Sequence, residues 1–246
     1  MDVFEAIKTR RSIRAFRPDL IPRESIRKIL DAARYAPSAG NLQSWEFILV
    51  EDISNIIKLC DACLEQQFIL RAPLIIVVCT DTDRSAVLYG SRGKYFYSMA
   101  EVCAAVQNLM LAAHSLGLGT CWVGAFDEQK VRAYLNLPAA VVPIAIIPVG
   151  YPELIPQTPQ RASIGDITHF EKYGKFEVVR TGEPESGTPP GTQAGAQASA
   201  RQDASKEWLE KGEEEKIGEG ELGERVKELI GGILGPQDRQ REKKKE

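Results

Sequence analysis

The sequence has few histidines, no long apolar run and no strong net charge, and each absence removes a class of protein. Its only two histidines, His114 and His169, stand far apart in 246 residues, so a site built from several imidazoles is not indicated. The net charge of −3 argues against an electrostatic nucleic-acid binder. No apolar run approaches the ~20 residues of a membrane helix. The first residues lack a basic stretch followed by an apolar one, so we expect no signal peptide and a cytoplasmic protein.

The chain also lacks the phosphate-binding motifs of the common nucleotide folds. No G-x-G-x-x-G follows a predicted strand and no P-loop is present, so neither type of site is indicated. Five cysteines without a secretory signal fit reduced thiols. Residues 60–63 form a C-x-x-C, which fits a redox dithiol or half of a metal site, but no second close pair accompanies it. We interpret Cys60 and Cys63 as ordinary buried cysteines on a helix and expect no metal.

The composition changes near residue 180 and divides the chain in two. Residues 1–180 are dense in periodic apolar residues and predict a domain with a hydrophobic core. Residues 181–205 are rich in Gly, Pro, Ser, Thr, Ala and Gln, which predicts a disordered linker. Apolar residues at helical spacing from Leu222 to Ile233 predict a helix in the charged tail, so that residues 181–246 are a linker and a tail. The tail either binds a partner or has no chemical role.

Helical and strand patterns alternate within residues 1–180 and predict helices packed on a central mixed sheet. The predicted helices are Val3–Thr9, Pro22–Tyr35, Ser54–Gln67, Tyr97–Leu116 and Asp127–Leu135, and the predicted strands are Trp45–Val50, Leu74–Thr80, Thr120–Gly124 and Val142–Val149. Asp2 is a candidate N-cap of the first helix. The run Leu74–Thr80 is apolar throughout, as in a sheet covered on both faces. Pro143 and Pro148 predict irregular pairing near the ends of the last strand.

The predicted helix 97–116 is apolar around nearly its whole circumference. Such a helix is buried on all sides. In a domain of this size, that pattern favours packing against a second subunit as well as against the chain's own sheet. The alternative is a central helix of a monomer.

Three segments carry candidate binding residues. Arg10, Arg11, Arg14 and Arg17 fall within eight residues and alternate with apolar positions, which fits either recognition of an anion or a structural ion-pair cluster. Residues 36–45 place small residues and two side-chain amides in a loop, as a planar ring with mixed donors and acceptors requires, although a plain turn fits too. Residues 117–126 contain glycines that let backbone approach a ligand closely.

In this order, the three segments resemble the nitroreductase family of FMN enzymes. The family's R-R-S-x-R-x-F, P-S-x-x-N-x-Q-P-W and G-L-G-T-x-W-x-G motifs stand here at residues 10–16, 37–45 and 117–124, and Gly150-Tyr151-Pro152 with Arg161 resembles its closing segment. The resemblance covers about residues 1–176. Ser44 departs from the pattern, because the family commonly has proline there.

The resemblance implies an α+β fold, an intertwined homodimer, and two FMN molecules in the dimer interface. Arg10 and Arg161 would contact the phosphate, while Ser12 and Arg14 would face the ribityl chain and the pyrimidine edge. Arg11 would serve either the phosphate or the structure alone. Other residues would reach the flavin from the partner subunit or complete the pocket. The implied cofactor-binding residues are Arg10, Arg11, Ser12, Arg14, Pro37, Ser38, Asn41, Gln43, Trp122, Val123, Gly124 and Arg161.

The implied activity is a ping-pong cycle in which NADH or NADPH delivers hydride to FMN and a nitroaromatic, a quinone or a similar acceptor is then reduced. No catalytic protein residue is implied, because the chemistry belongs to the cofactor. Relatives use the same fold for dehalogenation, flavin fragmentation or ring dehydrogenation. Residues 81–97, with Tyr89, Arg92, Lys94 and Tyr95, are either a substrate lid or a plain surface connection. A non-catalytic flavin-binding protein is the alternative of another class.

Overall fold

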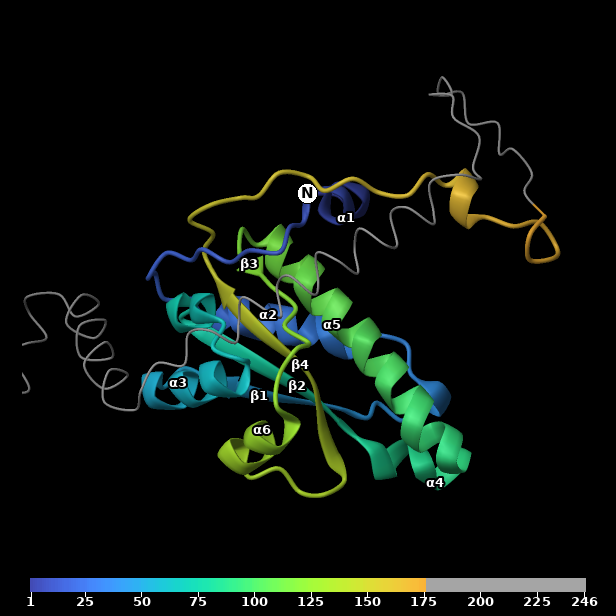
Figure 1. Cartoon of the computed structure of the whole chain (residues 1–246), viewed down its shortest axis with the longest axis horizontal. Helices are drawn as coiled ribbons and strands as arrows, with labels where there is room; N and C mark the ends of the chain where they lie inside the picture. Colours follow the sequence, from blue (N-terminus) through green and yellow to red (C-terminus); the bar gives the residue numbers. More distant parts are fainter. Residues whose placement is uncertain (176–246) are drawn as a thin grey trace, which may run out of the picture. The chain divides into compact units, whose positions relative to one another are not determined.

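The computed structural model describes residues 1–175, which fall into two units (Figure 1). The first unit is Met1–Gln160 and contains the sheet and the helices around it. The second unit begins at Arg161 and contains a short 3-10 helix, Gly165–Ile167, and a ring contact between His169 and Tyr173 with centroids 4.4 Å apart. The predicted boundary at residue 180, the linker and the tail lie outside the described residues.

Four strands form one sheet at the centre of the first unit, in the order β1-β2-β4-β3 (Figure 1). The strands are β1 at Trp45–Val50, β2 at Leu74–Asp81, β3 at Gly119–Thr120 and β4 at Val141–Gly150. Each neighbouring pair is antiparallel. A parallel bridge joins Ser12 to Thr120, so the sheet that the sequence predicted as mixed is antiparallel apart from this edge contact. Helices on an antiparallel sheet make the fold α+β, as expected.

Strand β2 separates two hydrophobic cores, which explains why it is apolar throughout. Its residues alternate between the two faces of the sheet because successive strand side chains point in opposite directions. Leu74, Ile76 and Val78 belong to the core under α2 (Arg23–Arg34) and α5 (Ser98–Ser115). Ile75, Val77 and Cys79 belong to the core under α3 (Ile53–Ala62) and α6 (Glu128–Leu135). The sheet covered on both faces is therefore confirmed.

The other predicted elements are largely confirmed, with two differences in their bounds. Helix α3 ends at Ala62 rather than at residue 67, because Leu64 and Glu65 both adopt a left-handed conformation with φ of 56°. Strand β3 is only two residues long, and its predicted continuation to residue 124 consists of a bridge between Val123 and Ile146. The register shifts where Val78 pairs with Ala145 but Cys79 pairs with Pro143, which confirms the irregular pairing predicted at the first proline. At Pro148, which pairs with Ile75 in unbroken register, the predicted irregularity is not found.

The chain between β2 and α5 is helical, although the sequence left it open as a lid or a surface connection. Helix α4 covers Thr82–Arg92 and a π-helical turn, η3, covers Gly93–Tyr97. Gly90 interrupts α4 with φ 55° and ψ −139°, a conformation that glycine adopts without a Cβ penalty. Tyr89 and Tyr97 stack edge to face at 5.2 Å between ring centroids.

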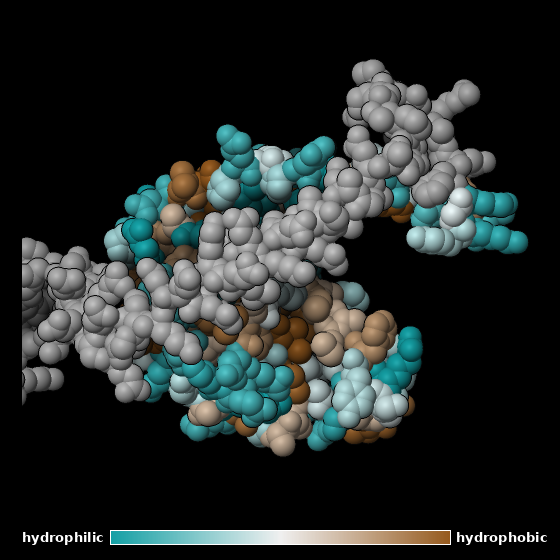
Figure 2. All heavy atoms as spheres, in the orientation of Figure 1, coloured by the Kyte–Doolittle hydropathy of each residue, from teal (hydrophilic) through white to brown (hydrophobic). Residues whose placement is uncertain are grey.

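Helix α5 buries one face and exposes the other within a single chain. Its inward face carries Val102, Ala105, Val106, Leu109, Met110 and Ala113. Met99, Cys103 and Gln107 on the outward face are exposed, so one chain does not bury this helix all round. Figure 2 shows hydrophobic side chains at the surface where α5 faces the viewer. Nowhere in residues 1–175 is a helix both long and apolar enough to cross a membrane.

Candidate functional site

The arginine segment, residues 10–17, follows helix α1 (Val3–Thr9). A backbone hydrogen bond and buried side chains hold it in place. Asp2 caps this helix as predicted, accepting the N–H groups of Phe4 and Glu5. The N–H of Ile13 donates to the carbonyl of Thr120 at 2.9 Å, which ties the segment to β3. Ile13 and Phe16 are buried, at 4% and 1% exposure, which confirms the predicted alternation.

Gly119 makes this close approach possible. A Cβ at that position would lie 2.6 Å from Cγ1 of Ile13, far inside van der Waals contact. We expected the glycines of residues 117–126 to let the backbone approach a ligand closely. At Gly119 the backbone instead accommodates the side chain of Ile13. Packing between Ile13 and Gly119 thereby sets the position of the neighbouring Ser12 and Arg14.

Cations gather where the arginine segment meets the end of α5. The pKa of His114 is lowered below its usual value, mostly by burial and to a smaller extent by the positive charges of Arg10 and Arg11. Nε2 of His114 lies 2.8 Å from the hydroxyl of Thr9. The guanidinium of Arg11 donates to the carbonyls of Lys8 and Arg10, at 2.7 and 2.8 Å, and to the hydroxyl of Thr158. These cations are suited to an anionic group such as a phosphate.

The third predicted segment meets the arginine segment at Cys121. Burial raises the pKa of the Cys121 thiol, and the charges of Arg14 and Arg10 and a hydrogen bond with Ser12 partly offset that effect. Val123 exchanges two backbone hydrogen bonds of 3.0 Å with Ile146, which holds the chain straight after β3.

The end of this segment leaves backbone accessible beside an aromatic ring. Trp122 is half-buried and packs against the core under α5, whereas Gly124 is exposed. A Cβ on Gly124 would meet only the ring of Trp122, at 3.5 Å. Backbone here is open to a planar ligand. Arg14, in the arginine segment, places its guanidinium 5.7 Å from the ring centroid of Phe68.

The second predicted segment, residues 37–44, adopts an unusual backbone conformation. Gly40, Asn41 and Gln43 have φ of 57°, 57° and 52°, in the left-handed region. The hydroxyl of Ser38 accepts the N–H of Gln43 at 3.2 Å, and the side-chain amide of Gln43 donates to the carbonyl of Asn41 at 3.1 Å. Pro37 is exposed at the start of this loop. Disfavoured backbone conformations of this kind cluster at ligand-binding loops.

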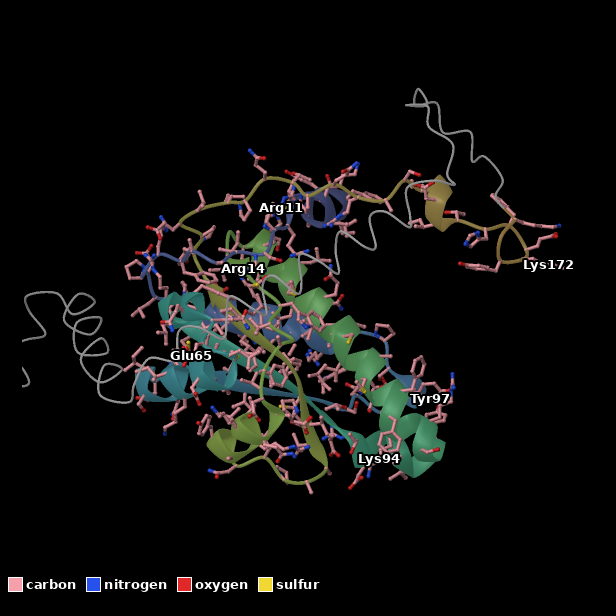
Figure 3. The ribbon with its side chains drawn as sticks, in the orientation of Figure 1. Arg11, Arg14, Glu65, Lys94, Tyr97 and Lys172 are labelled. Atoms are coloured by element: carbon pink, nitrogen blue, oxygen red, sulfur yellow. The ribbon has the colours of Figure 1, made fainter. Side chains whose placement is uncertain are left out.

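The structure brings the first and third segments together but places the second at the opposite end of α5. Thr9 contacts His114 near the C-terminal end of this helix. The loop contacts Glu101 near its N-terminal end, where the carboxylate accepts the N–H groups of Ala39 and Ser44. The thirteen residues from Glu101 to His114 span ~20 Å of helix. Figure 3 shows Arg11 and Arg14 near one end of α5 and Tyr97 at the other.

Ser44, which departs from the family motif, is buried and hydrogen-bonded. Ser44 is fully buried, its hydroxyl lies 3.0 Å from that of Thr80, and its N–H donates to Glu101 at 2.9 Å. A proline at this position has no N–H to donate, so the serine allows a hydrogen bond that the family's usual residue could not make.

Arg161, the other predicted phosphate contact, is exposed and belongs to the second unit.

Sequence reasoning missed two residues that organise the loop. Glu101 is buried at 4% exposure, and Arg84 donates to the carbonyl of Gln43 at 2.7 Å and to Glu46 at 2.5 Å. A lone glutamate in an otherwise apolar helix was the available signal, because buried glutamates almost always have partners.

The C-x-x-C pair behaves as predicted for buried structural cysteines. Burial raises the pKa of Cys60 to about 11 and that of Cys63 to about 12, so neither thiol ionises readily. Both lie at the C-terminal end of α3 in the second core. In the part of the chain that the structure describes, no group of three or more His, Cys, Asp or Glu could hold a metal ion.

Comparisons with known proteins agree on one family. The model of the nitroreductase family matches residues 7–69 and 56–151. A Methanothermobacter thermautotrophicus protein named "Putative NADH dehydrogenase/NAD(P)H nitroreductase" is 37% identical over 177 residues, covering 70% of this chain and 88% of that protein. A 5,6-dimethylbenzimidazole synthase from Rhodospirillum rubrum is 31% identical, covering 63% and 84%. The structure of an NADPH:FMN oxidoreductase from Vibrio harveyi complexed with NAD+ superposes with a TM-score of 0.65 at 25% identity, covering 71% and 79%.

Proposed function

The chain belongs to the nitroreductase family, and we propose that it is an FMN-dependent oxidoreductase that uses NADH or NADPH as its electron donor. The observation that carries this proposal is the meeting of the arginine segment with the open backbone after β3. The segment supplies cations beside buried anchor residues, and the backbone at Gly124 leaves room for a flat ring. This donor set fits a phosphate joined to a planar heterocycle.

The proposed roles follow from these positions. Arg10 would hold the phosphate with support from Arg11, while Ser12 and Arg14 would face the ribityl chain and the pyrimidine edge. The backbone of residues 122–124 would lie against the ring. When bound, FMN would supply the redox chemistry that links NAD(P)H to an acceptor such as a nitroaromatic or a quinone in a ping-pong cycle. Arg161 stays a proposed phosphate contact.

We propose further that each site is completed by a second copy of the chain. Residues 10–14 would take both the phosphate and the ring edge at one end of α5, whereas the loop contacts this helix ~20 Å away, which favours contact between the loop and a different flavin. Pro37, Ser38, Asn41 and Gln43 would instead contact the flavin of the partner subunit. The exposed, largely apolar outward face of α5 supports this arrangement, because a second subunit would cover it.

A flavin-fragmenting activity is the second candidate. The similarity to a 5,6-dimethylbenzimidazole synthase favours it, at 31% identity over 84% of that protein. In this reading the bound flavin is the substrate rather than a resident cofactor. The aromatic rings of Tyr89 and Tyr97, with Arg92 5.3 Å from the latter ring, are available in residues 81–97 as contacts to a substrate.

One experiment tests these proposals together. The protein is purified, its visible flavin absorbance is measured, and FMN is added until it binds no more. The loaded protein is then reduced anaerobically with NADH and with NADPH and mixed with a panel of nitroaromatics and quinones. We expect a yellow protein that is reduced by nicotinamide and reoxidised by an acceptor.

Three other outcomes would contradict the proposal or indicate a different function. A colourless protein that ignores added FMN would contradict the proposal. Loss of the flavin spectrum during aerobic turnover, with release of a benzimidazole, would establish the second candidate. Stoichiometric FMN without any turnover would indicate a non-catalytic flavin-binding protein.

A further inference from the structure

Glu101 is a buried carboxylate in the first turn of α5, beside the loop 37–44. Only 4% of its surface is exposed, and its two oxygens accept hydrogen bonds from different parts of the loop. Oε2 accepts the N–H of Ala39 at 3.1 Å, and Oε1 accepts the N–H of Ser44 at 2.9 Å. The hydroxyl of Ser85, on α4, lies 3.4 Å from Oε1.

The two N–H groups stand at either end of the left-handed stretch of the loop. Gly40, Asn41 and Gln43 lie between Ala39 and Ser44 in sequence, and all three have positive φ. Such conformations persist only where the surrounding structure fixes them. A single carboxylate that accepts from both ends fixes the span between them.

We infer that Glu101 is the positioning residue that holds the loop 37–44 in the shape that presents Ser38, Asn41 and Gln43 to a flavin. This inference rests on the proposed function. Glu101 acts through the loop backbone, and Arg84 supports the same loop from another side by donating to the carbonyl of Gln43 at 2.7 Å. The carboxylate suits this role because each N–H donates to a different oxygen, whereas an amide has a single accepting oxygen and an apolar side chain has none.

The test is Glu101→Gln, which keeps the shape of the side chain but replaces one accepting oxygen with an NH2 group. One loop N–H then faces a donor and loses its partner. In the cofactor-free protein, we expect hydrogen exchange at Ala39 or Ser44 to become at least tenfold faster. The N–H of Asn55, capped by Asp52 at the start of α3, is the internal reference and should not change. The dissociation constant of FMN should rise about tenfold.

Two control variants separate positioning from general destabilisation. Glu128→Gln makes the same chemical change at the N-terminus of α6, where the carboxylate accepts from Arg132. Leu59→Ala opens the core on the other face of the sheet, where Leu59 is fully buried. We expect neither control to change local exchange at Ala39 and Ser44 or the affinity for FMN.

Three results would overturn the inference. The first is unchanged exchange at both loop amides in Glu101→Gln. The second is faster exchange with unchanged affinity for FMN, which would remove the link between the loop and the flavin. The third is an equal effect in Leu59→Ala. If the wild-type protein binds no FMN, the proposed function fails, and the exchange measurement alone still decides whether Glu101 holds the loop.

Discussion

The two ends of helix α5 are built from opposite chemistry. At the C-terminal end, His114 lies beside Arg10 and Arg11, and the segment is anchored through Ile13 on β3. At the N-terminal end, the carboxylate of Glu101 accepts backbone N–H groups of a loop whose residues adopt left-handed conformations. One end offers positive charge on a rigid backbone, and the other offers amide groups on a shaped loop.

This difference supports the proposal that one chain contributes half of each of two sites. Cations suit a phosphate, whereas side-chain and backbone amides suit the polar edge of a planar ring. Because the two halves contact α5 at Glu101 and His114, ~20 Å apart along the helix, one chain is poorly arranged to close both halves on the same small ligand. Two copies packed with their α5 helices antiparallel would place unlike ends together, twice.

The largest effect is expected from mixing two chains that are defective at different ends. One chain carries Arg10→Ala and Arg14→Ala, and the other carries Asn41→Ala and Gln43→Ala. Hydrogen bonds to charged groups contribute about 1.5–3 kcal/mol each, so the first chain should bind FMN roughly 100-fold more weakly or worse. In a mixed dimer, one site receives both defects and the other receives neither. We expect one FMN per mixed dimer at wild-type affinity, measured by fluorescence titration of differently tagged, co-purified chains.

The reciprocal mixture is the control for this prediction. A chain with all four substitutions is paired with a wild-type chain. If the halves come from different subunits, each site then has one defect and none is intact. Recovery of one wild-type site in the reciprocal mixture, and none in the first, would mean that each chain builds its own site.

The sequence predicted the separate parts of the site better than their arrangement. Asp2 and strand β1 at Trp45–Val50 lie where local patterns put them, because capping and apolar periodicity are short-range signals. The distance between the arginine segment and the loop depends on the packing of α5 against the sheet, which no local pattern contains. Glu101 could be recognised in the sequence as an isolated charge in an apolar helix. The two N–H groups that its carboxylate accepts, however, lie 57 and 62 residues away in the chain. The sequence shows the residue type, but it does not show this tertiary contact.

Gly119→Ala should have the second-largest effect, because it disturbs the anchor of the arginine end. The new Cβ would lie 2.6 Å from Ile13, and forced overpacking costs about 1–3 kcal/mol. For a domain of this size, the melting temperature should fall by several degrees, at roughly 2–4 °C per kcal/mol. Affinity for FMN should fall with it, since Ser12 and Arg14 flank Ile13 in the chain.

Gly124→Ala is the matched variant for Gly119→Ala on the same segment. Its Cβ would have its nearest neighbour at 3.5 Å, an ordinary contact, so thermal stability should change by less than about 0.5 kcal/mol. FMN should nevertheless bind more weakly if this backbone lies against the ring. Equal melting temperatures for the two alanine variants would disprove the anchoring role of Gly119.

Gly40→Ala should have a smaller effect, confined to the loop end. The position has φ of 57°, and a Cβ there would lie 2.8 Å from the hydroxyl of Tyr89. A left-handed conformation costs a non-glycine residue about 1–2 kcal/mol. Adding Tyr89→Phe to Gly40→Ala removes the contact but not the backbone strain, so we expect partial recovery of the melting temperature. Complete recovery, or none, would contradict this division of the cost.

The smallest expected effect is a pH dependence that belongs to the arginine end alone. The pKa of His114 is lowered from its usual 6.5 by burial and then by Arg10 and Arg11, with Glu5 acting in the opposite direction. The unfolded chain therefore binds a proton at His114 before the folded chain does, and stability present above pH 6.5 declines as the pH falls toward the folded-state pKa. In cofactor-free protein, His114→Gln should flatten this slope in urea unfolding measured between pH 7.5 and 5. Glu101→Gln, at the other end of α5, should leave the slope unchanged, because the cations that act on His114 all lie at the arginine end. A slope that survives His114→Gln would place its origin in another group.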